Sequence, residues 1–62
     1  MKSREEILIK MLSKKLPEVN TADGIKNLLN DFFELADDFE TSMTSQWTMV
    51  GYVFDLFRKG EL

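Results

Sequence analysis

Apolar residues recur at helical spacing in three segments of the chain, and the pattern is clearest from Ile25 to Phe39. Eight apolar side chains of this segment occupy one arc of about 160° in a helical projection, as an amphipathic helix requires. These are Ile25, Leu28, Leu29, Phe32, Phe33, Leu35, Ala36 and Phe39. Thr21 or Asn20 is a suitable capping residue. We therefore predict a helix over about 22–40.

The first segment predicts a helix over about 4–16. Ser3 and Glu6 have the spacing of a capping box, and Pro17 disfavours helical geometry at the residue before it. The segment has two apolar stripes. One contains Leu8, Leu12, Leu16 and Ile9, and the other contains Ile7 and Met11, with Lys15 between the stripes. The second stripe either packs within the molecule, with the Lys15 methylenes along its edge, or meets a partner.

The last apolar run, from Trp47 to Phe57, predicts a helix over about 46–59. Thr48–Phe54 also alternates as a strand does and is rich in β-branched and aromatic residues. A helix is favoured because the run continues into a basic last turn that is followed by Gly60. Ser42, Thr44 or Ser45, in the polar connector 41–45, could cap this helix.

The third predicted helix has a wider apolar arc than a surface helix needs. The arc spans about 220°, whereas a stripe of a little over 100° covers one neighbour. The helix therefore lies centrally in its own domain or serves a second surface. We expect Trp47 to turn into the core with Phe54, although an exposed interface anchor is the alternative. That arrangement leaves Met49, Tyr52 and Leu56 outside as the predicted contact surface.

Together these segments predict an all-α fold, a small three-helix bundle that forms a single domain over residues 1–62. A chain of 62 residues lies in the size range where domains are marginally stable. With no Cys and no His, disulfides and a structural zinc site are not expected. Self-association or docking on a partner is the remaining common means of stabilisation.

The net charge of −3 is unevenly distributed along the chain. Residues 1–15 contain five basic and two acidic side chains, whereas residues 18–40 contain seven acidic and one basic. Asp31, Glu34 and Asp38 form an acidic ridge on the polar face of the second predicted helix. The ridge is a solvated face, a partner-facing surface for a basic protein, or, least favoured, a metal site, because no alternating calcium-loop array is present.

Candidate chemistry is sparse. Without His or Cys, Ser and Thr have no recognisable base, and the three glycines are isolated and form no phosphate-binding loop. Asp55 is explained by an ion pair with Arg58. We expect no enzymatic activity, cofactor, metal or small-molecule substrate. No membrane span or signal-peptide core is apparent, which favours a cytoplasmic protein.

Two functions remain. The first is a small, non-catalytic protein-interaction module, self-associating or docking on a larger protein as a regulator, inhibitor or adaptor. Its predicted interface comprises Met49, Tyr52, Leu56, Ile7 and Met11. The alternative is a compact helix-turn-helix-like nucleic-acid-binding domain, with phosphate contacts from Lys2, Arg4, Lys10, Lys14 and Lys15. The acidic balance argues against the alternative. The size and composition suit a small accessory protein of a bacterium, phage or plasmid.

Overall fold

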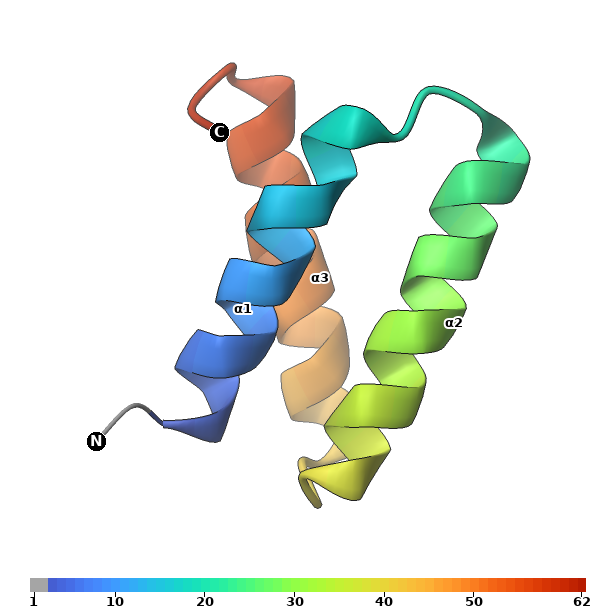
Figure 1. Ribbon diagram of the computed structural model, residues 1–62. Helices are drawn as coiled ribbons and strands as arrows, with labels where there is room; N and C mark the ends of the chain where they lie inside the picture. Colours follow the sequence, from blue (N-terminus) through green and yellow to red (C-terminus); the bar gives the residue numbers. More distant parts are fainter. Residues whose placement is uncertain (1–2) are drawn as a thin grey trace.

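The computed structural model describes residues 3–62, and these residues form the predicted three-helix bundle (Figure 1). Helix α1 spans Arg4–Lys15 and is followed by a short 3₁₀ turn, η1, at Leu16–Glu18. Helix α2 spans Ala22–Asp38 and helix α3 spans Met43–Arg58. Helices α1 and α3 run in the same direction and α2 runs opposite to both.

Helix α1 packs against both other helices, so it is the central element of the bundle. Helices α2 and α3 approach each other less closely along their lengths. In Figure 1 they diverge from the end where the chain joins them towards the end where α2 begins and α3 finishes. The wide apolar arc of the last segment therefore does not reflect a central position of α3.

Local capping signals begin all three helices. The side chains of Ser3, Thr21 and Ser42 each accept a hydrogen bond from a backbone N–H three residues later. Such bonds satisfy donors that the first turn of a helix otherwise leaves unpaired. With Ser42 as its cap, α3 begins at Met43, three residues before the predicted start. Residues 43–45 therefore belong to the helix and not to the connector.

Helix α2 ends at Asp38, two residues before its predicted end. Glu40 has a φ of 58°, which places it in the left-handed region and stops the helix. The Glu40 N–H then bonds to the Asp37 carbonyl at 2.9 Å, and the Thr41 N–H bonds to the Ala36 carbonyl at 3.1 Å. These two bonds make a Schellman motif without glycine. Gly60, with a φ of 75°, ends α3 by the same arrangement.

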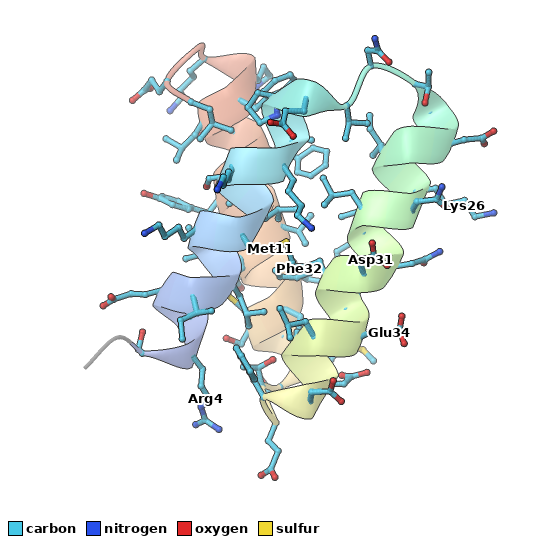
Figure 2. All side chains as sticks on the ribbon, in the orientation of Figure 1. Arg4, Met11, Lys26, Asp31, Phe32 and Glu34 are labelled. Carbon is cyan, nitrogen blue, oxygen red and sulfur yellow. The ribbon has the colours of Figure 1, made fainter. Side chains whose placement is uncertain are left out.

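The core consists of three rows of side chains, one from each helix. Residues four apart on α1 and α2 supply two of the rows, and α3 supplies Met49, Val50 and Val53. The first row is Leu8 and Leu12 of α1, continued by Leu16 of η1, and the α2 row is Leu28, Phe32 and Ala36. Figure 2 shows Phe32 pointing from α2 towards the other helices, where its side chain is fully buried. The main stripe predicted on the first helix and the arc predicted on the second are therefore the core-facing surfaces.

Candidate protein-interaction surface

The position of α3 decides which apolar side chains stay outside. Its buried residues are Gln46, Met49, Val50 and Val53, and Met49 is only 4% exposed. The expectation that Met49 lies on the outer surface is therefore wrong. The helix packs with the flank that carries Met49 against its neighbours. On the opposite flank Phe54 packs against the core, as expected, whereas Trp47 lies towards solvent.

Trp47 lies outside the core, contrary to the preferred prediction. Its side chain is 57% exposed, although one side of the indole packs against Phe33 of α2 with ring centroids 4.9 Å apart. Residues one position away from a buried row lie at the edge of a helix interface, where a large ring can contact one neighbour only. Trp47 adopts this edge position beside the buried Gln46.

The other α3 residues with predicted roles divide between the surface and the boundary of the core. Tyr52 is 54% exposed and Leu56 is half-buried. Phe57 lies on the same side of the helix as the buried Val50 and Val53, yet its side chain is exposed. It lies in the last turn of α3, at the end of the bundle where α2 is farthest away (Figure 1), so one of its expected neighbours is missing.

An open groove lies between α2 and the first turns of α3. It has a volume of about 460 Å³ and is lined by Phe33, Asp37, Met43, Gln46 and Trp47. We call it the aromatic groove. Met43 is 74% exposed and Phe33 is half-buried, so apolar surface is accessible on both of its sides. The sequence places Phe33 and Trp47 on the apolar faces of two different helices. It does not show that the two side chains are in contact.

Gln46 fixes the floor of the aromatic groove. Its Nε2 donates to the Asp37 Oδ1 at 2.8 Å and to the Thr41 carbonyl oxygen at 3.1 Å. The Thr41 hydroxyl in turn donates to the Ala36 carbonyl at 2.8 Å. This network ties the end of α2 to the start of α3 and satisfies a buried amide. Gln46 was not predicted as a site residue; the only signal is its helical spacing of four and seven residues from Val50 and Val53.

A second open groove runs along α1 and has a volume of about 390 Å³. It is lined by Ile7, Lys10, Met11, Lys14 and Lys15, and we call it the lysine groove. Ile7 is 40% exposed, whereas Met11 is half-buried and packs against the core. The second apolar stripe of the first helix is thus only partly covered within the molecule.

The acidic ridge lies on the outer face of α2. Asp31, Glu34 and Asp38 are all exposed, and Figure 2 shows Glu34 pointing away from the other two helices. None of the three forms an ion pair with another residue of 3–62. Within the same residues, no group of three or more acidic side chains is arranged to hold a metal ion.

The basic residues proposed to contact phosphates are divided between two places on the molecule. The Arg4 guanidinium donates to the Phe39 carbonyl oxygen at 2.8 Å, which places it at the acidic end of α2. Lys10, Lys14 and Lys15 are exposed around the lysine groove. Lys2 lies outside the described residues.

Asp55 forms the ion pair expected from its spacing with Arg58. The Arg58 Nη2 lies 2.6 Å from Asp55 Oδ1, and the Lys59 Nζ lies 3.0 Å from Asp55 Oδ2. Hydrogen bonds from Arg58 and then from Lys59 lower the pKa of the Asp55 carboxyl below its ordinary value of 3.8. This local pair at the end of α3 explains Asp55 without a catalytic role.

The chain was compared with known protein families, curated proteins and solved structures. No protein-family model, no curated protein and no solved structure matches the chain. Within residues 3–62, no helix combines the length and apolarity needed to cross a membrane.

Proposed function

We propose that this protein is a small, non-catalytic interaction module that docks on a partner protein through apolar side chains of α1 and α3. The observation that carries the proposal is the exposure of Trp47 and Tyr52 on the same helix, together with Met43 and Ile7. The core closes without these side chains. Trp and Tyr are the residue types that most often dominate binding energy when a partner covers them.

Single exposed apolar residues are ordinary on protein surfaces. Here they are grouped, because Met43, Phe33 and Trp47 line one continuous groove. Such a groove gives a partner side chain a place to insert, which is typical of interface anchors. The proposed interface is therefore centred on Met43, Phe33 and Trp47, and the buried Met49 is removed from it. Tyr52, Leu56, Ile7 and Met11 lie outside this groove and remain predicted contact residues.

The test uses the purified full chain as bait against an extract of the organism that encodes it. Wild type is compared with Trp47→Ser, with Tyr52→Ser and with the control Lys26→Ser, which changes an exposed residue of α2 outside both grooves. We expect the wild type and Lys26→Ser to retain the same protein, and Trp47→Ser to lose at least about tenfold in affinity, as hot-spot truncations do.

The retained protein is then purified and mixed with the chain, and light scattering gives the mass of the complex. A defined binary complex supports docking, and a concentration-dependent mass of the chain alone supports self-association. The proposal fails if all variants retain the same proteins equally, or if the chain stays monomeric and forms no saturable complex.

A further inference from the structure

We propose that the aromatic groove receives an arginine side chain of the partner protein, stacked on Trp47 and paired with Asp37. This inference rests on the proposed docking function and specifies what one part of the surface recognises. It follows from the placement of an exposed indole beside a carboxylate that is held in position and forms no ion pair within residues 3–62.

The apolar wall of the groove suits a flat cationic group. Trp47 is supported on one side by Phe33, with the two rings tilted by 54° to each other, and the remaining indole surface is exposed. Among the aromatic side chains, Trp attracts a cation over its face most strongly. A guanidinium is planar and weakly hydrated, so it stacks on such a face better than the ammonium of lysine does.

The carboxylate of Asp37 is oriented for a partner. Its Oδ1 accepts the hydrogen bond from the buried Gln46 amide at 2.8 Å, which fixes the side chain at the edge of the groove. Its Oδ2 accepts no hydrogen bond from residues 3–62, and no Lys or Arg of these residues forms an ion pair with Asp37. A guanidinium can donate to this oxygen while its plane lies against the indole.

The surrounding charge favours a cation at this end of the molecule. Four carboxylates lie within residues 34–40, namely those of Glu34, Asp37, Asp38 and Glu40, and none is ion-paired within residues 3–62. The carbonyl end of the α2 dipole has the same sign. Arg4, whose guanidinium donates to the Phe39 carbonyl oxygen and keeps its charge, and the amino end of α3 oppose this field. One guanidinium does not offset four carboxylates, so the net charge at this end of the molecule is negative. The partner is therefore a protein segment with an exposed arginine next to an apolar residue that fits beside Met43.

The test measures binding of a capped peptide that contains a central Arg-Leu pair. A matched peptide carries citrulline, which keeps the shape of arginine and removes its charge. Trp47 is the only tryptophan of the chain, so its fluorescence reports on the groove directly. Amide shifts in nuclear magnetic resonance spectra locate the bound peptide. We expect the arginine peptide to bind roughly fivefold more tightly than the citrulline peptide, with the largest shifts at residues that line the groove.

Two variants separate the role of Asp37 from that of general charge. Asp37→Asn keeps an oxygen that accepts from Gln46 but removes the negative charge, so the fold is retained. Asp38→Asn removes the same charge from a neighbouring residue that does not line the groove. We expect Asp37→Asn to weaken binding of the arginine peptide roughly fivefold and Asp38→Asn to weaken it less than twofold.

The outcomes distinguish this inference from the proposed function. Equal binding of the two peptides, or equal effects of the two variants, overturns the arginine assignment but leaves apolar docking in place. The absence of any saturable response up to about 10 mM arginine peptide also overturns the assignment. If Trp47→Ser loses the natural partner and Asp37→Asn retains it, the arginine assignment is also overturned. If all variants retain the partner, the proposed docking function is wrong.

Discussion

Gly51 is the residue whose local environment gives the simplest prediction. It lies in the middle of α3, is exposed, and has open space where a Cβ atom would be placed. No described residue therefore requires a glycine at position 51 for close packing. A helical glycine without such a contact carries a cost in conformational entropy and no compensating gain.

Gly51→Ala is expected to raise the free energy of unfolding by about 1 kcal/mol, because alanine restricts the unfolded chain and favours the helix. Urea denaturation followed by far-ultraviolet circular dichroism measures the change. Gly24→Ala is the matched control, since its Cβ atom would lie 2.8 Å from Val19 Cγ1 and 3.0 Å from Thr21 Oγ1. An equal gain from both substitutions would contradict the argument.

Glu40 shows what a residue pattern alone does not reveal. Charge and periodicity allowed the second helix to run through residue 40, but the chain turns there with a positive φ that favours glycine. The two hydrogen bonds of the Schellman motif hold a residue with a side chain in this conformation. Such an end is decided by the path of the chain into α3.

At the scale of the element, capping and charge account for where the helices begin and end. The sequence predicts Ser3 as the cap of the first helix and Thr21 or Asn20 as the cap of the second, because a short polar side chain there can accept from the first turn. The structure confirms Ser3 and selects Thr21. For the start of α3 the connector 41–45 offers three candidate caps, Ser42, Thr44 and Ser45. Only the structure selects Ser42 among them.

The ion pairs at the end of α3 predict a dependence on pH. Arg58→Gln removes the hydrogen bond that contributes most to the lowered pKa of Asp55, so the pKa is expected to rise towards its ordinary value of 3.8. Titration of the Asp55 carboxyl carbon by nuclear magnetic resonance measures it. Because the folded-state pKa is depressed, the stabilising contribution of Asp55 is present above pH 3.8 and is lost as the pH falls through the lowered pKa.

The matched control for this titration is Arg4→Gln, because Arg4 bonds to the Phe39 carbonyl and not to Asp55. It should leave the titration of Asp55 unchanged. Identical midpoints for the wild type and Arg58→Gln would show that the pair does not form in solution, as exposed ion pairs sometimes do not.

At the scale of the whole molecule, a small core makes each fully buried side chain important. The described chain has a radius of gyration of 11.1 Å and extends over 29 × 23 × 19 Å. Its interior is limited to short rows from three helices, and such small domains have only a few kcal/mol of stability to lose. The absence of disulfides leaves packing as the main source of cohesion.

Leu12→Ala is expected to lower the free energy of unfolding by about 3 kcal/mol, because Leu12 is fully buried on the central helix and its truncation leaves a cavity. Thermal and urea unfolding measure the loss. Ile7→Ala removes a side chain of similar size from the exposed stripe of the same helix and should cost much less. Equal losses would mean that Ile7 is covered in solution, as self-association would require.

Much of the fold and part of the candidate surface followed from the chain alone. Spacing identified the three helices, the all-α bundle and most of the core rows, because a helix places residues three and four apart on one side whatever it packs against. The same reasoning placed Asp31, Glu34 and Asp38 outside and paired Asp55 with Arg58. These properties are local: each depends on residues within a few turns of one helix.

Only the tertiary structure decided which flank of each wide apolar arc is covered. The arc of the last helix could hide either Met49 or Trp47, and the neighbouring helices cover the first and expose the second. The meeting of Phe33 with Trp47, and of Gln46 with Asp37, likewise joins two helices through their relative rotation. Periodicity determines the width of an apolar surface, whereas the position of its neighbours determines which part remains available to a partner.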